Sequence, residues 1–136
     1  MPFWTAFRVA ASLILMLPAA GSALTTQCNP GPYMIFFDFN SAYLNKDMRM
    51  TLDNADRAYD NCGTAHVVLE GHVDARESPD LAQERQDVVR TYLERRGIRP
   101  ANIIARPSGM SRPAIVTENG VSELQNRRVD ITYEPS

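Results

Sequence analysis

Three polar residues stand at positions where their side chains could together bind a small zwitterion. Asn40 and Asp74 each follow a short apolar run that is typical of a buried strand, and Arg85 comes eleven residues after Asp74. Open α/β sheets bind ligands just beyond the carboxyl ends of their strands. A carboxylate attracts an ammonium group, and a planar guanidinium can chelate a carboxylate through two parallel hydrogen bonds. Asp74 and Arg85 therefore have the charges that the free amino and carboxyl groups of an amino acid require.

Each of these residues also has a purely structural interpretation. Asp74 could form a turn, Arg85 could be a solvated charge on a helix, and Asn40 could be a residue at a strand end. For an isolated Asp or Arg the structural interpretation is the better one. The placement of all three residues together favours a binding site.

Four segments have the composition or periodicity of β-strands. Residues 33–39 are an apolar, aromatic run, and residues 65–73 contain a second run, Val-Val-Leu; both are typical of buried strands. Residues 103–104 are a short strand candidate. Residues 129–133 alternate apolar with polar side chains, which predicts a strand with one buried face.

Two segments show the helical spacing of apolar residues. The first follows Asn45, a capping residue, and its apolar side chains recur at i, i+4, i+7 and i+11 from Met48. The second follows Ser78 and Pro79, a capping residue and a proline suited to the first helical position, and it ends at Gly97. Its inner stripe consists of Leu81, Val88, Val89, Tyr92 and Leu93.

The predicted order of elements is β-α-β-α-β-β. Alternating strands and helices imply right-handed crossovers and parallel pairing, with the last strand completing a mixed sheet. The expected fold class is α/β, an α+β sandwich with a mixed sheet and the helices packed on one face. Residues 33–136 are expected to form a single domain, within which residues 107–122, rich in Pro, Ser and Gly, form a loop.

Residues 1–23 have the layout of a secretory signal peptide. A single charged residue, Arg8, precedes a short apolar core, and the segment ends in the small-residue run Ala-Ala-Gly-Ser-Ala. The core is shorter than the roughly 20 apolar residues that a membrane span needs, although an uncleaved anchor is the alternative. Cleavage near Ala23 would release the mature chain into the periplasm, and we expect it not to insert stably into a membrane. Its first residues, 24–32, are expected to form an extended lead-in.

Export gives the two cysteines of the chain a specific meaning. Cys28 and Cys62 are the only pair, and an oxidising compartment favours a disulfide between them. Two free thiols or a metal site are the alternatives. The cysteines and the two histidines lack zinc-finger spacing, so we expect no metal, and no other cofactor is indicated. The residues before Cys28 lack the small residue that a lipoprotein cleavage site needs, so we expect no attached lipid.

The charge and the missing motifs argue against several classes of function. The chain has a net charge of −2, which becomes −3 without residues 1–23, because Arg8 is their only charged residue. A mildly acidic chain without a Lys/Arg block is a poor candidate for binding nucleic acid. It contains no Gly-rich phosphate loop and no His-Glu-x-x-His motif. His72 near Asp74 is the one acid–base pair worth naming, and no nucleophile accompanies it, so we expect no enzymatic activity.

Three segments, in the right order and spacing, resemble motifs of the OmpA-like family, which includes the OmpA C-terminal domain, Pal and MotB. Residues 37–42 (Phe-Asp-Phe-Asn-Ser-Ala) resemble its first-strand motif, and residues 71–74 (Gly-His-Val-Asp) resemble its Gly-His-Thr-Asp turn. Residues 126–131 (Asn-Arg-Arg-Val-Asp-Ile) are similar to its closing strand, Asn-Arg-Arg-Val-Glu-Ile, and residues 81–93 resemble its second helix. Together the similar segments cover nearly all of residues 33–133.

The resemblance implies a ligand and a role for each of the three polar residues. Members of this family bind bacterial cell-wall peptidoglycan, without catalysis, through the diaminopimelate residue of its stem peptide. Carried over to this sequence, Asp74 would take the ammonium group of that residue and Arg85 its carboxylate. Asn40 would add polar contacts. Both charged side chains would then line an open crevice.

The resemblance also implies a place of action, a small cell-wall-associated protein of the periplasm, near the outer membrane. Asp38, His72 and Arg128 would support the ligand-contacting residues from behind. Relative to the usual spacing of the family, we expect the connection 75–84 to be about four residues, or one helical turn, shorter. Arg76-Glu77-Ser78-Pro79 occupies this shorter connection. The alternative function is that of an OmpA-like scaffold that has lost wall binding and contacts another envelope protein.

Overall fold

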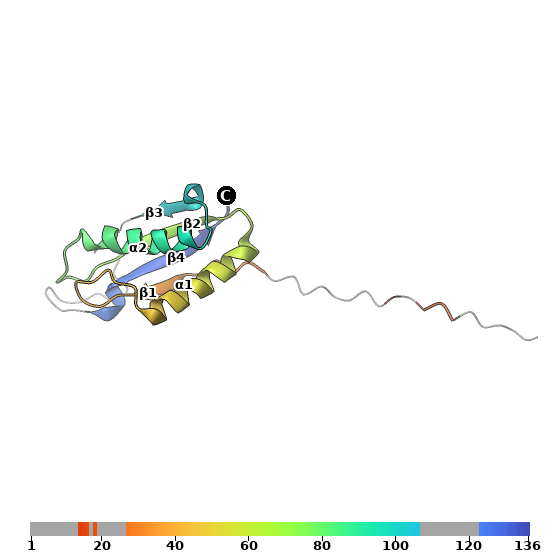
Figure 1. The fold of residues 1–136 in the computed structure, drawn as a ribbon, viewed down its shortest axis with the longest axis horizontal. Helices are drawn as coiled ribbons and strands as arrows, with labels where there is room; N and C mark the ends of the chain where they lie inside the picture. The colour runs from red at the N-terminus through yellow and green to blue at the C-terminus, as the bar shows by residue number, and fades with distance from the viewer. Residues whose placement is uncertain (1–13, 17, 19–26, 107–122) are drawn as a thin grey trace, which may run out of the picture.

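A four-stranded sheet forms the centre of the described part of the chain (Figure 1). The computed structural model describes residues 14–16, 18, 27–106 and 123–136. The strands are β1 (Tyr33–Phe36), β2 (His66–Gly71), β3 (Ile103–Ala105) and β4 (Arg128–Glu134), and their order in the sheet is β1-β4-β2-β3. The predicted loop 107–122 and nearly all of the predicted leader 1–23 lie outside the described residues.

The sheet is mixed, as predicted, and β4 is the strand that makes it so. β2 and β3 pair in parallel, whereas β4 runs antiparallel to both β1 and β2. Strands β1, β2 and β3 therefore all point the same way, which is what β-α-β crossovers require. The last strand is inserted between β1 and β2 and separates them.

Two helices cover one face of this sheet (Figure 1). They are α1 (Lys46–Tyr59) and α2 (Leu81–Arg95), and α1 lies mainly against β1 while α2 lies against β2 and β4. The predicted cap of α1 is confirmed, because the Asn45 side chain accepts a hydrogen bond from the Met48 backbone N–H at 3.0 Å. Capping residues satisfy backbone donors that the first helical turn leaves without partners.

The predicted start of the second helix is wrong. α2 begins at Leu81, and neither Ser78 nor Asp80 caps it with its side chain. Instead, the backbone carbonyls of Ser78 and Pro79 accept hydrogen bonds from the N–H groups of Leu81 and Ala82 at 3.1 and 3.2 Å. A backbone turn therefore satisfies the first donors of the helix, so no side-chain cap is needed.

The core lies between the sheet and the helices. In β1 and β4 buried residues alternate with more exposed ones, whereas β2, inside the sheet, is buried continuously through Val67, Val68 and Leu69. The apolar stripes of α1 and α2 close over one face of the sheet. The principal buried members are Ile35, Leu52, Ala55, Val67, Leu69, Val89, Leu93, Val129, Ile131 and Tyr133.

The predicted disulfide is confirmed, and it lies at the end of the domain where α1 finishes. Cys28 bonds to Cys62, the last residue of the short turn Asp60–Cys62 that follows α1. The lead-in continues alongside the sheet, because the Pro30 carbonyl accepts a hydrogen bond from the Tyr133 N–H at 2.9 Å. Both cysteines of the chain are joined in this bond.

No helix in the described part of the chain combines the length and the apolar character needed to cross a bilayer. Two further short turns, Pro100–Asn102 and Leu124–Asn126, lead into β3 and β4.

Candidate functional site

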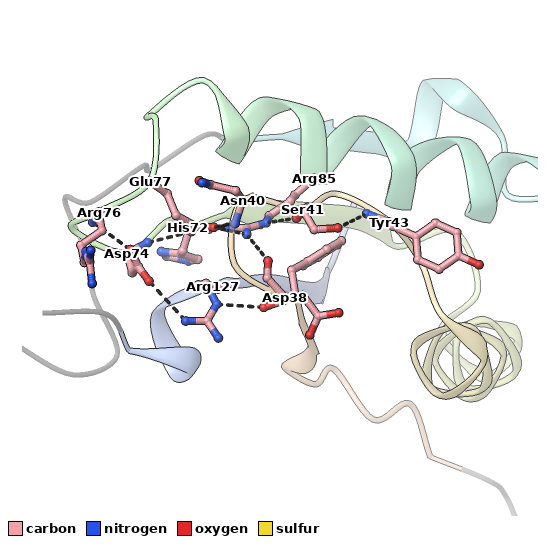
Figure 2. A network of polar contacts seen from close by, with 11 residues as sticks. Asp38, Asn40, Ser41, Tyr43, His72, Asp74, Arg76, Glu77, Arg85 and Arg127 are labelled. Atoms are coloured by element: carbon pink, nitrogen blue, oxygen red, sulfur yellow. Dashed lines mark hydrogen bonds and ion pairs between the residues drawn. The ribbon is translucent and has the colours of Figure 1, made fainter.

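Two loops meet at the edge of the sheet where β1 and β2 end (Figure 2). One follows β1 and contains Asp38, Asn40 and Ser41; the other follows β2 and contains Asp74 and Glu77. They meet because β1 and β2 point the same way, so their carboxyl ends lie at the same end of the sheet, on either side of the start of β4. The structure brings Asn40 and Asp74 together, because the backbone N–H groups of both donate to Glu77.

Arg85, on α2, lies beneath both loops and is completely buried. Its five N–H donors all have acceptors within the protein. The backbone carbonyls of Asp38, Ser41 and His72 accept three of them at 2.9–3.1 Å, and Glu77 accepts the other two at 2.5 and 2.7 Å. The guanidinium thus connects β1, β2 and α2 at the ends where ligands are expected.

The position of Arg85 depends on two close packings. Gly71, at the end of β2, has no room for a β-carbon because the Ala82 carbonyl lies against it, so only glycine lets α2 approach this closely. The ring of Phe37 lies 5.1 Å from the guanidinium carbon of Arg85, within the range of a cation–π interaction. Glycine and the aromatic ring therefore fix both the helix and the charge that it carries.

Glu77 is the partner of Arg85, and no sequence pattern points to it. Its two carboxylate oxygens accept four N–H bonds: two from the guanidinium, one from the Asn40 backbone at 2.8 Å and one from the Asp74 backbone at 3.1 Å. The Glu77 side chain has no exposed surface. We call these four donors, from Asn40, Asp74 and Arg85, the carboxylate cradle.

Asp74 lies beside the cradle and is also buried. One of its carboxylate oxygens accepts the Arg76 backbone N–H at 2.8 Å, and the other is 3.3 Å from the Arg127 guanidinium. Arg127 in turn donates to the Phe37 carbonyl at 3.0 Å. Figure 2 shows the Asp74 carboxylate pointing toward Arg127. Arg127, which the sequence suggests only as a structural or supporting charge, is thus the partner of Asp74.

The expectation that both charged side chains line an open crevice is wrong. Asp74 is 1% exposed and Arg85 is 0% exposed. The reason is the neighbouring turn, which supplies a carboxylate to the guanidinium and so allows both charges to be buried together. Asn40 is exposed, with a backbone φ of 53°, and its contribution to the cradle is its backbone N–H.

The residues expected to support the site do so partly through their backbones. Asp38 and His72 offer Arg85 their carbonyl oxygens, while the Asp38 side chain is exposed. The His72 and Arg128 side chains lie elsewhere, where both contact the Asp130 carboxylate, at 3.2 and 2.9 Å.

The contacts of Asp130 also determine its protonation. Partial burial acts to raise the pKa of the Asp130 carboxyl, but the hydrogen bonds from His72 and Arg128 outweigh it and bring the pKa below its ordinary value. Asp130 is therefore held as a carboxylate, and this cluster ties the end of β2 to β4 just behind the Asp74 loop.

Curated relatives with similar sequences include proteins named peptidoglycan-associated lipoprotein. The peptidoglycan-associated lipoprotein of Pseudomonas aeruginosa is 31% identical over 100 residues, which cover 71% of this chain and 59% of that protein. The protein of the same name from Buchnera aphidicola is 29% identical over 104 residues, covering 74% of this chain and 60% of its own length. The chain thus spans about three fifths of the length of these relatives.

Solved structures show the same fold. The crystal structure of the peptidoglycan-associated lipoprotein from Burkholderia pseudomallei matches with a TM-score of 0.66 and 25% identity, covering 75% of this chain and 90% of that one. The C-terminal domain of Helicobacter pylori MotB matches with a TM-score of 0.68 and 19% identity, covering 79% and 88% of the two chains. A family model, described as the OmpA family, matches residues 36–127, which span both loops of the cradle and α2. The chain belongs to the OmpA family.

Proposed function

We propose that this protein binds peptidoglycan non-covalently in the cell envelope, without catalysing a reaction. The observation that carries the proposal is the carboxylate cradle: four N–H donors from three segments converge on one buried carboxylate at the loop-bearing edge of the sheet. The names of the relatives from Pseudomonas aeruginosa and Buchnera aphidicola support the choice of ligand. Periplasmic localisation after cleavage near Ala23 is part of the same proposal.

The finer proposal is that the ligand group is the free amino-acid end of diaminopimelate in the stem peptide. Its carboxylate would take the place in the cradle that the Glu77 carboxylate occupies, with Arg85 as the chelating group. Its ammonium would pair with Asp74, which lies beside the cradle and now contacts Arg127. Asn40 would contribute its backbone N–H and, from its exposed position, further polar contacts.

Co-sedimentation with purified sacculi tests this proposal. Asp74→Asn should weaken binding by roughly thirty- to hundredfold, because a charged hydrogen bond contributes about 2–3 kcal/mol. Free meso-diaminopimelate should compete with sacculi for the wild-type protein. Asp80→Asn is the matched control, because Asp80 is an exposed acid six residues further along the chain and outside the cradle, and it should bind like wild type.

A second function has an observation in its favour. Both charges of the site already have partners within the protein, Arg85 with Glu77 and Asp74 with Arg127. An OmpA-like scaffold that has lost wall binding, and that contacts another envelope protein, would keep such internal pairs for stability alone. Wild-type protein that ignores sacculi and meso-diaminopimelate at all concentrations would favour this alternative and contradict the wall-binding proposal.

A further inference from the structure

We infer that Glu77 is an internal ligand of this domain, a carboxylate of the chain itself that occupies the carboxylate cradle and must leave before a free carboxylate can bind there. The inference deepens the proposed function and rests on it for the identity of the incoming ligand. The occupancy of the cradle by Glu77 is independent of that identity.

The bonding of Glu77 is what a bound carboxylate ligand would have. Both oxygens accept two N–H bonds each, and the guanidinium of Arg85 approaches in the two-pronged geometry by which Arg binds free carboxylates. Two of the donors are backbone N–H groups of Asn40 and Asp74, on different loops. The Asp74 N–H bond belongs to a local turn, because the Glu77 N–H donates in return to the Asp74 carbonyl at 3.2 Å. The other three bonds come from Asn40 and Arg85, which no local turn requires, so these donors would be available to another carboxylate.

The segment that carries Glu77 is attached to the domain mainly through that side chain. In residues 75–80 it is the one buried residue, and the others are exposed. The backbone bonds of the segment are local ones: the N–H groups of Arg76 and Glu77 donate to Asp74, and the start of α2 donates back to residues 78–80. Withdrawal of the Glu77 carboxylate would therefore leave β2 and α2 intact.

The charge of the cradle explains why one carboxylate must replace another. Arg85 has no exposed surface, and a buried guanidinium without an anion is strongly unfavourable. If Glu77 leaves, the incoming carboxylate restores both the charge balance and the four hydrogen bonds. The exchange is opposed mainly by the high local concentration of a group on the same chain. An external carboxylate binds the wild-type protein weakly, because the cradle is free of Glu77 in only a small fraction of the molecules.

The test uses acetate, the simplest carboxylate, and two substitutions of Glu77. Glu77→Ala empties the cradle, and Glu77→Gln keeps the volume but brings an NH2 group that cannot accept hydrogen bonds. About 100 mM sodium acetate, against sodium chloride of equal ionic strength, should raise the melting temperature of both variants by about 4–8 °C. This is the shift expected from a ligand present at roughly five times its Kd. If Glu77→Ala is unfolded in chloride, it should fold in acetate, as circular dichroism would detect.

Two proteins should not respond to acetate. The wild-type protein has a filled cradle, and Glu84→Ala removes an exposed glutamate at the start of α2 that takes no part in it. A stabilisation of these two proteins equal to that of the Glu77 variants would mean a general salt effect and would overturn the inference. Indifference of both Glu77 variants to acetate would overturn it as well.

Sacculi provide a second measurement that separates this inference from the proposed function. If both are right, Glu77→Gln should bind sacculi about tenfold more tightly than wild type, because no internal carboxylate competes. An acetate response with no sacculus binding by any protein would keep the internal ligand and reject peptidoglycan as its competitor. Sacculus binding by wild type, unchanged in variants that ignore acetate, would keep the proposed function and reject the internal ligand.

Discussion

Replacing Arg85 by alanine should destabilise the domain severely, and not merely weaken ligand binding. The substitution removes all five hydrogen bonds of a guanidinium that has no exposed surface and leaves the Glu77 carboxylate buried without its counter-ion. Breaking a buried ion pair by removing one partner costs about 3–5 kcal/mol. Since small domains are stable by only about 5–15 kcal/mol, this loss is a large part of the total.

The measurement is urea unfolding followed by circular dichroism, which gives the free energy of unfolding from the midpoint and slope. Arg95→Ala is the matched control, because Arg95 is an exposed arginine on the same helix, and it should change the free energy of unfolding by no more than about 0.5 kcal/mol. The double variant Arg85→Ala/Glu77→Ala should lose less than the sum of the two single variants, since it leaves no unpaired charge. A loss below about 1 kcal/mol for Arg85→Ala would refute the buried pair.

Three further outcomes follow from the structure. Replacing Cys28 and Cys62 by serine should lower the free energy of unfolding by roughly 3–4 kcal/mol, which is the chain-entropy value for a loop of 34 residues. Thiol titration of unfolded, unreduced wild-type protein should find no free thiol. The pKa of Asp130 is lowered in the folded state. Its contribution to stability is therefore present above about pH 4 and is lost as the pH falls through the folded pKa. Asp130→Asn should make the melting temperature less sensitive to acid in that range. Gln86→Met should leave the free energy of unfolding in urea unchanged or raise it by up to about 1 kcal/mol, because the Gln86 Oε1 atom is buried without a partner among the described residues. The Leu69 carbonyl would lose the Gln86 Nε2 donor at 3.3 Å but keep the Arg106 N–H at 2.7 Å, and a loss above about 1 kcal/mol would contradict this.

Much of the fold could be predicted from local patterns. The spacing of apolar residues from Met48 gave the buried face of α1, and Asn45 gave its cap, because both effects act within a few residues along the chain. The buried alternation of β4 is likewise a local signal. The position of β4 between β1 and β2 was not predictable from such patterns, because strand neighbours depend on contacts between segments that lie far apart in the sequence.

The candidate site was predicted in part. Asn40, Asp74 and Arg85 do come together, because the carboxyl ends of β1 and β2 lie at one edge of the sheet. Glu77 was missed, because a glutamate surrounded by exposed residues in an irregular segment has the sequence signature of a solvated charge. One signal could have revealed it: the connection before Arg85, which we expect to be about one helical turn shorter than in the family, contains an acid.

The burial of Arg85 connects the stability of the domain to its proposed function. A guanidinium enclosed by Phe37 and three backbone carbonyls requires an anion, because its charge is otherwise uncompensated in a site that excludes water. The anion can come from the chain or from a ligand, and the same four donors can serve either one. In this protein the Asp74–Glu77 turn brings Glu77 into the cradle, so the chain itself supplies the anion. The contact between Glu77 and Arg85 stabilises the free domain, but it must break before an external carboxylate can bind in the cradle. Replacing Glu77 should therefore lower the stability of the free domain and raise its affinity for an external carboxylate.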